Sequence, residues 1–164
     1  MKFGAEHIMK RISLADYEKL YFDEEFNVAL CKQVKLSRDL IKREEKDGKL
    51  ERVVRVSPDR EIPKPVAKVI GSNRIEYTEY VQYEYGKHLA KWYTKSSVLS
   101  DKVETHGEVR FAEVPGGVKR ILNGEITVKI FGVGKIIEKF VAADIERGYE
   151  DAAKFTQQWI DKNS

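Results

Sequence analysis

The stretch Ile126-Thr-Val-Lys-Ile130 leads into Gly132-Val-Gly134 and then into a long segment that ends at Trp159-Ile160, and this succession decides the fold. Alternation of apolar and polar side chains in the first part predicts a strand with one buried face. From residue 135 onward, apolar side chains recur at steps of three and four, which predicts a single amphipathic helix. At about 1.5 Å per residue, such a helix is roughly 35–40 Å long. It needs a wide apolar surface to pack against, and a curved sheet provides one.

The segments before this helix are mostly strand-like. Residues 2–10 alternate between apolar and polar side chains and predict a first strand. Three predicted hairpins follow, around Asp47-Gly48, Gly86 and Pro115-Gly-Gly117, and Asp-Gly is a strong hairpin signal. Their strands are residues 36–45 with 49–58, 75–85 with 89–97, and 103–114 with 118–130. Because crossover helices between these strands are missing, we expect an antiparallel sheet.

Short helices complete the predicted order. Ser13 and Asp23 suit the N-caps of two short helices directly after the first strand. Between the first two hairpins, Pro65 suits a first helical position and Gly71 a C-terminal cap. We therefore predict a single α+β domain over residues 1–164, in which a seven-stranded curved antiparallel sheet wraps around the C-terminal helix. One helix cannot fill the concave side of such a sheet, so we expect a cavity between them.

Composition excludes several classes of partner. The 30 basic and 27 acidic side chains are interspersed, and a nucleic-acid-binding protein would show a basic block or stripe. No window approaches the roughly 18–20 apolar residues that span a bilayer, so we expect no stable membrane insertion, with transient membrane contact left open. The amino-terminal residues lack the apolar region of a signal peptide. A single cysteine, Cys31, forms no internal disulfide and suits a reducing compartment, so we expect a cytoplasmic protein.

Several motifs resemble those of a known superfamily. They are Pro65-Val-Ala-Lys-Val-Ile-Gly71, Ile75-Glu-Tyr77-Thr-Glu79, Asn123-Gly-Glu-Ile-Thr-Val-Lys-Ile130, Gly132-Val-Gly134-Lys-Ile-Ile-Glu138-Lys, and Trp159 near the end. Over nearly its whole length the chain resembles the START-like, or Bet v 1-like (SRPBCC), helix-grip superfamily. Within it, the chain resembles an uncharacterised bacterial family, and the string from Val128 to Lys139 is also similar to sterol-transfer domains. The resemblance implies an internal hydrophobic cavity, often for a lipid, sterol or polyketide, and implies no catalytic residues.

The predicted cavity wall follows from the inward faces of these elements. We expect ligand-binding side chains on the sheet at Tyr77, Glu79, Val81, Trp92, Val109, Phe111, Leu122 and Ile126. From the long helix we expect Ile137, Phe140, Val141 and Ile145 to close the cavity. The short helix between the first two hairpins carries Val66, Val69 and Ile70 on one side and is a candidate lid.

Three polar residues interrupt the apolar faces. Glu79 shares a strand face with Tyr77 and Val81, and a buried carboxylate requires a partner or a raised pKa. His7 and Arg120 lie in similar positions on the first and last strands, which are neighbours in this fold and would bring the two together. We expect a charge pair that satisfies Glu79 inside the cavity or recognises the polar end of a ligand. The alternative is that the strand is inverted and Glu79 faces solvent.

Other motifs give weaker signals. The turn Gly132-Val-Gly134-Lys135 could hold an anion at a helix N-terminus, but it lacks a third glycine and a Gly-Lys-Ser/Thr motif. A sharp turn that needs glycine is the preferred interpretation. The three histidines lack metal-ligand spacing, and no serine has a nucleophile-elbow context. We therefore expect no metal, no cofactor and no assigned catalytic residue.

Three functions agree with this sequence. The first is non-enzymatic binding or transport of a hydrophobic, lipid-like small molecule in the internal cavity. The second is an enzyme of the polyketide cyclase or lyase type, in which Glu79 acts with His7 or Tyr77. The third is a protein-interaction domain whose cavity is filled by its own side chains. The identity of the ligand and the oligomeric state stay open.

Overall fold

The computed structural model describes residues 1–59 and 61–164. The strands within this part of the chain are β1 (Lys2–Lys10), β2 (Leu36–Lys46), β3 (Lys49–Pro58), β4 (Tyr77–Glu84), β5 (Leu89–Ser96), β6 (Val103–Val114) and β7 (Gly117–Val128). The helices are α1 (Leu14–Tyr21), α2 (Glu24–Gln33), α3 (Lys64–Ile70) and α4 (Gly134–Lys162). The predicted α+β fold, with two short helices after the first strand and a long helix at the end, is confirmed.

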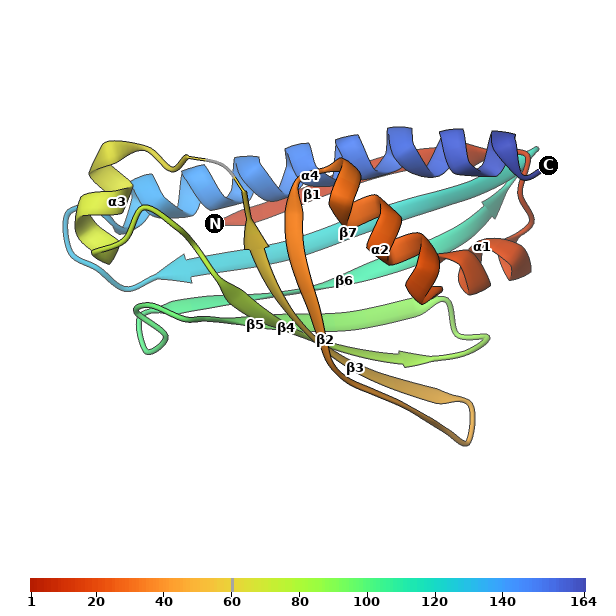
Figure 1. Cartoon of the computed structure of the whole chain (residues 1–164), viewed down its shortest axis with the longest axis horizontal. Helices are drawn as coiled ribbons and strands as arrows, with labels where there is room; N and C mark the ends of the chain where they lie inside the picture. The colour runs from red at the N-terminus through yellow and green to blue at the C-terminus, as the bar shows by residue number, and fades with distance from the viewer. Residues whose placement is uncertain (60) are drawn as a thin grey trace.

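The strands form one antiparallel sheet in the order β1-β7-β6-β5-β4-β3-β2. The sheet curls beneath α4, which runs along its whole length in Figure 1. Strands β1 and β7 pair as predicted for the first and last strands, and residue 7 lies opposite residue 120 in their register. The three predicted hairpins correspond to β2–β3, β4–β5 and β6–β7. The first and last of the seven strands in sequence are thus joined, while β2 forms the opposite edge.

Side-chain caps begin the two short helices where the sequence predicts. The Ser13 hydroxyl accepts a hydrogen bond from the Asp16 backbone N–H at 3.1 Å, and an Asp23 oxygen accepts one from the Phe26 N–H at 2.9 Å. Each cap satisfies one of the N–H groups that a helix leaves free in its first turn. Helix α1 therefore starts four residues after the end of β1, and α2 starts three residues after the end of α1.

The predicted boundaries differ from the observed ones by one or two residues. Helix α3 begins one residue before Pro65 and ends at Ile70, and its C-cap Gly71 has the left-handed φ of 71° expected at that position. Strand β7 ends at Val128, before the predicted end at Ile130. Helix α4 extends two residues past Ile160.

The turn into α4 depends on glycine. Gly132 has a φ of 84°, a conformation that other residues rarely adopt. A Cβ atom on Gly134 would lie only 2.4 Å from the Val128 carbonyl oxygen, so only glycine fits where the start of the helix lies against the end of β7. This supports the interpretation of Gly132-Val-Gly134 as a sharp turn.

Helix α4 is fixed to the β1 side of the sheet. The Gln157 side-chain oxygen accepts from the Lys10 N–H at 2.7 Å, and its amide nitrogen donates to the Lys10 carbonyl oxygen at 3.0 Å. Farther along, Glu146 accepts from the Gly4 N–H at 3.2 Å. The helix packs most closely against β1 and β7, whereas the sheet curves away from it toward β4 and β3. Space therefore opens between α4 and the middle of the sheet.

No helix among residues 1–59 and 61–164 combines the length and the apolar character needed to cross a bilayer.

Candidate functional site

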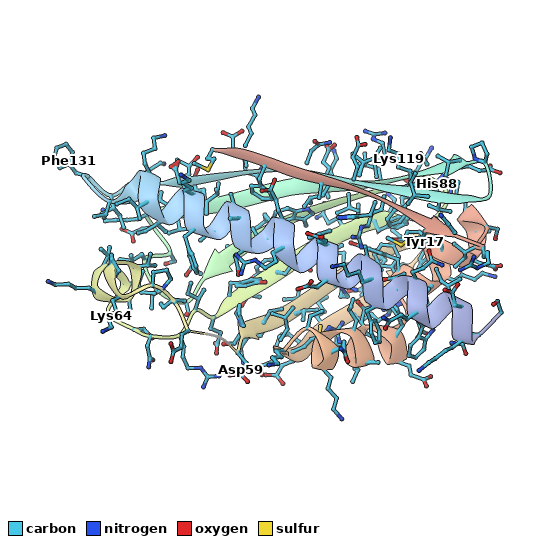
Figure 2. All side chains as sticks on the ribbon, turned by 90° about the horizontal axis from the view of Figure 1, so that it is seen from above. Tyr17, Asp59, Lys64, His88, Lys119 and Phe131 are labelled. Carbon is cyan, nitrogen blue, oxygen red and sulfur yellow. The ribbon has the colours of Figure 1, made fainter. Side chains whose placement is uncertain are left out.

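A cavity of about 280 Å³ lies between the concave face of the sheet and α4. Helices α2 and α3 close it on the flank of α4 that lies opposite β1, as seen from above in Figure 2. Helix α1 contributes Tyr17 and Tyr21 at the end near the C-terminus of α4. The wall thus combines side chains from every helix with side chains from the inner face of β2 to β7.

Most of the side chains predicted for the wall line this cavity. They are Tyr77, Glu79, Trp92 and Ile126 from the sheet, Ile137, Phe140, Val141 and Ile145 from α4, and Val66, Ile70 and Arg120. Four of the predicted residues are instead packed in the core, and the cavity-lining set does not include them: Val81, Val109, Phe111 and Leu122. Val69 also packs against the core, and His7 lies behind Arg120, outside the lining.

The part of the wall that comes from α2 and the first hairpin was not predicted from the sequence. These residues include Phe26, Leu30, Cys31, Arg38, Arg52, Val54 and Val56. For Arg52 a signal existed, because it alternates with Leu50, Val54 and Val56 on one strand face in the same way that Glu79 interrupts its own. For α2 the short apolar pattern did not show which surface the helix would cover.

Glu79 faces the cavity, and its partner is Arg52. Arg52 Nη2 lies 3.6 Å from Glu79 Oε1, with the arginine side chain 8 % exposed and the glutamate side chain 29 % exposed. The two residues belong to adjacent strands, β3 and β4. The Arg52 guanidinium also lies 5.8 Å from the centre of the Phe22 ring. The expected charge pair with Glu79 therefore exists on the cavity wall, and its cationic partner is Arg52, which was not predicted.

Arg120 holds together the opposite side of the site. It is 3 % exposed, its Nη2 donates to the Tyr149 carbonyl oxygen at 2.8 Å, and its guanidinium lies 4.8 Å from the centre of the Tyr149 ring. The same nitrogen lies 3.3 Å from His7 Nδ1. The predicted meeting of His7 and Arg120 is thus confirmed, and it ties β1 and β7 to α4.

The titratable groups around the cavity have shifted pKa values. Burial raises the pKa of Tyr17 to about 12, although the nearby Arg120 opposes the shift. Burial likewise raises the pKa of Tyr21 and of Tyr149, so these phenols are neutral hydrogen-bonding groups near pH 7. Burial lowers the pKa of His7, and Arg120 lowers it further, while Glu150 acts in the opposite direction.

Cys31 and the histidines show no arrangement for catalysis or metal binding. Cys31 lines the cavity, and burial raises the pKa of its thiol, which disfavours the reactive thiolate. In the part of the chain that the structure describes, no group of three His, Cys, Asp or Glu side chains is placed to hold a metal ion. Two carboxylates among the described residues line the cavity, that of Glu79 beside Arg52 and that of Asp144 on α4.

A curved seven-stranded sheet around one long terminal helix, with a cavity between them, defines the helix-grip class of proteins. The chain belongs within this class to the family described as "Protein of unknown function (DUF2505)", whose model matches residues 9–160. No curated protein sequence matches the chain.

Solved structures share the fold at low sequence identity. The protein TTHA0849 from Thermus thermophilus is 14 % identical with a TM-score of 0.72, covering 100 % of this chain and 99 % of that one. The Zhui aromatase/cyclase from Streptomyces sp. R1128 is 13 % identical with a TM-score of 0.65, covering 99 % and 95 %. Ara h 8.0201 is 10 % identical with a TM-score of 0.65, covering 98 % and 97 %. The TM-scores show a shared fold, and at such low identities the function has to be argued from the site.

Proposed function

We propose that this protein binds a hydrophobic, lipid-like small molecule in the cavity between the sheet and α4, and acts as a carrier for it. The observation that supports this most is the cavity itself, about 280 Å³ in volume, with a largely apolar wall and a few polar groups. Ligand pockets typically measure about 300–1,000 Å³ and have this kind of wall, so the cavity lies near the lower end of the range.

Binding energy would come mainly from apolar surface removed from water. A ligand that buries about 250 Å² of apolar area at about 25 cal/mol per Å² gains roughly 6 kcal/mol before the costs of association. The side chains that would supply this contact are those of Trp92, Ile126, Ile137, Phe140 and Ile145, all on the cavity wall. Val66 and Ile70 of α3 reach the same space, which supports α3 as the lid over the entrance.

The cavity volume argues against the third function, a protein-interaction domain with a filled interior. A water molecule occupies about 30 Å³ in the liquid, so the cavity has the volume of roughly nine waters. Its wall also includes apolar side chains from α3, Val66 and Ile70. We further propose a cytoplasmic location, supported by the single cysteine, and ligand exchange during transient membrane contact.

An enzyme of the cyclase or lyase type is the second candidate, because Glu79 is a partly buried carboxylate beside the cavity and is paired with Arg52. Tyr77 also lines the cavity, whereas His7 does not and would not act with Glu79 directly. The enzyme would be favoured over the carrier if the wild type converts a bound polyketide and Glu79→Gln still binds it but no longer converts it.

The carrier proposal can be tested by filling the cavity. Gly148 of α4 lines the cavity, and a Cβ atom added there meets nothing within 4 Å, so Gly148→Phe projects a ring into the space. Arg147→Phe places the same ring on the exposed side of the helix as a control. We expect the wild type and Arg147→Phe to bind the neutral dye Nile red with enhanced fluorescence, and Gly148→Phe to lose it. Equal fluorescence in folded wild type and Gly148→Phe would contradict binding in this cavity.

A further inference from the structure

The three arginines that line the cavity in the described part of the chain differ in how well their donors are satisfied. Arg38 Nη2 donates to both carboxylate oxygens of Glu24, at 2.9 Å and 2.7 Å. Arg120 donates to the Tyr149 carbonyl oxygen and contacts His7. Arg52 is different, because its Nε and Nη1 are buried and have no hydrogen-bond partner among residues 1–59 and 61–164.

The contact between Arg52 and Glu79 does not provide the missing hydrogen bonds of Arg52. Its 3.6 Å separation exceeds the roughly 2.7–3.2 Å of a direct N–H···O hydrogen bond, so the two groups attract each other without a close bond. Arginine does not lose its proton in proteins, so Arg52 cannot respond to burial by becoming neutral. A buried ion pair stabilises a fold only when further hydrogen bonds satisfy both partners. The pair therefore retains hydrogen-bonding capacity on the cavity wall.

The chemistry of the pair restricts the group that can use this capacity. A carboxylate against Arg52 would stand within a few Å of the Glu79 carboxylate, and an ammonium against Glu79 would stand equally close to Arg52. Each ion would gain one attraction and suffer one repulsion in a poorly solvated place. A hydroxyl is neutral and has both a donor and an acceptor, so it can donate to Glu79 and accept from Arg52 at once.

We propose that the cavity selects neutral amphiphiles with a hydroxyl group, which is bound between Arg52 and Glu79 while the apolar part lies against α4. The inference rests on the proposed function, because it concerns the same cavity. A ligand that displaces ordered water loses affinity unless it reproduces the water's hydrogen bonds, and the hydroxyl meets this condition. The apolar remainder then lies against apolar side chains of α4 that line the cavity, such as Ile137, Phe140 and Val141.

The test compares three small probes of similar size by isothermal titration calorimetry at neutral pH. Octanol has the hydroxyl, its isomer heptyl methyl ether has an acceptor but no donor, and octanoate has a negative charge. Hydrogen bonds to charged groups contribute enough that we expect octanol to bind about tenfold more tightly than the ether. We also expect octanol to bind more tightly than octanoate.

Two variants test whether the preference for octanol over the other probes depends on Arg52 and Glu79. Glu79→Gln keeps the size of the side chain and removes the repulsion of anions, so octanoate should gain affinity relative to octanol. The double variant Arg52→Met with Glu79→Leu replaces the pair by apolar groups, an exchange that folded proteins often tolerate. In that variant octanol and the ether should bind equally.

The outcomes separate the two proposals. Equal binding of octanol and the ether to the wild type, with Nile red still bound, would overturn the hydroxyl inference and leave the carrier proposal standing. A preference for octanol that persists in the double variant would also overturn it. If the wild type binds neither Nile red nor any of the three probes, the carrier proposal itself fails.

Discussion

At the scale of single residues, Arg120 is a buried charged group that contacts two other elements of the fold. It joins β7 to α4 through the Tyr149 carbonyl oxygen and to β1 through His7. We expect Arg120→Met to lower the free energy of unfolding by about 1.5–3 kcal/mol, because the substitution removes a charged donor whose hydrogen bond to the Tyr149 carbonyl oxygen is then lost. Urea denaturation measures this value.

The neighbouring lysine serves as a control for Arg120. Lys119 pairs with Glu6 at 3.0 Å, but both side chains reach solvent, and such pairs contribute less than about 1 kcal/mol. Lys119→Met should therefore change the stability little. Equal effects of the two substitutions would show that Arg120 does not fix α4 to the sheet.

His7 gives the fold a dependence on pH. Its pKa in the folded protein lies below the ordinary value of 6.5, because burial and Arg120 disfavour the charged ring. As the pH falls through 6.5, the unfolded chain binds a proton at His7 before the folded chain does, so stability decreases. We expect His7→Gln to lose less stability than the wild type as the pH falls from neutral to the lowered pKa of His7. Urea denaturation at several pH values tests this, and an unchanged dependence of stability on pH in His7→Gln would contradict it.

Single residues also show how far the sequence could predict the site. A polar residue in an apolar row identified Glu79 and Arg120, because only the periodicity of a strand is needed to see it. The same rule applies to Arg52, but its partner depends on which strands are adjacent, and β3 lies beside β4 through a connection that contains α3. The pairing of Arg52 with Glu79 is therefore a property of the sheet and not of either strand alone.

At the scale of secondary-structure elements, two glycines differ in whether the fold has room for a side chain at their position. Gly148 lies in α4 beside open space, so Gly148→Ala should raise the free energy of unfolding by about 0.5–1 kcal/mol through lower backbone entropy in the unfolded chain. Gly107 lies in β6, where a Cβ atom would be 2.3 Å from the Asn123 carbonyl oxygen and 2.7 Å from the Trp92 ring. Because this space is already filled, Gly107→Ala should lower the free energy of unfolding by about 1–3 kcal/mol.

Thermal unfolding of both variants measures the contrast. We expect the two substitutions to change the free energy of unfolding with opposite signs, because one methyl group enters the cavity and the other enters a packed contact between strands. A destabilising Gly148→Ala would mean that this face of α4 is packed, and it would remove the space in which we expect the ligand.

The elements themselves were largely predictable, for local reasons. Caps at Ser13 and Asp23, the Asp47-Gly48 turn and the period of α4 are encoded within a few residues of each boundary. The faces covered by α2 and α3 were harder to predict, because both are short and partly buried, and their contacts lie on strands far away in sequence. This is why the wall residues on α2 were missed.

At the scale of the whole molecule, the cavity follows from where α4 is held. Hydrogen bonds from Gln157 and Glu146 fix it along β1, and the curl of the sheet leaves the space on its other flank for α2 and α3 to close. The sequence predicted that such a space exists. It did not predict its boundary, and Val81, Val109, Phe111 and Leu122 lie in the core because the curvature of the sheet decides which inward side chains meet each other.

Native mass spectrometry of the purified protein tests the central claim, that the cavity holds a hydrophobic small molecule, most directly. The account predicts a complex heavier than the chain alone, whose extra mass is released on denaturation and recovered as a neutral lipid-like compound, and whose abundance falls in Gly148→Phe but not in Arg147→Phe. A wild-type protein that has the bare mass of the chain, both as purified and after incubation with neutral lipids, would contradict it.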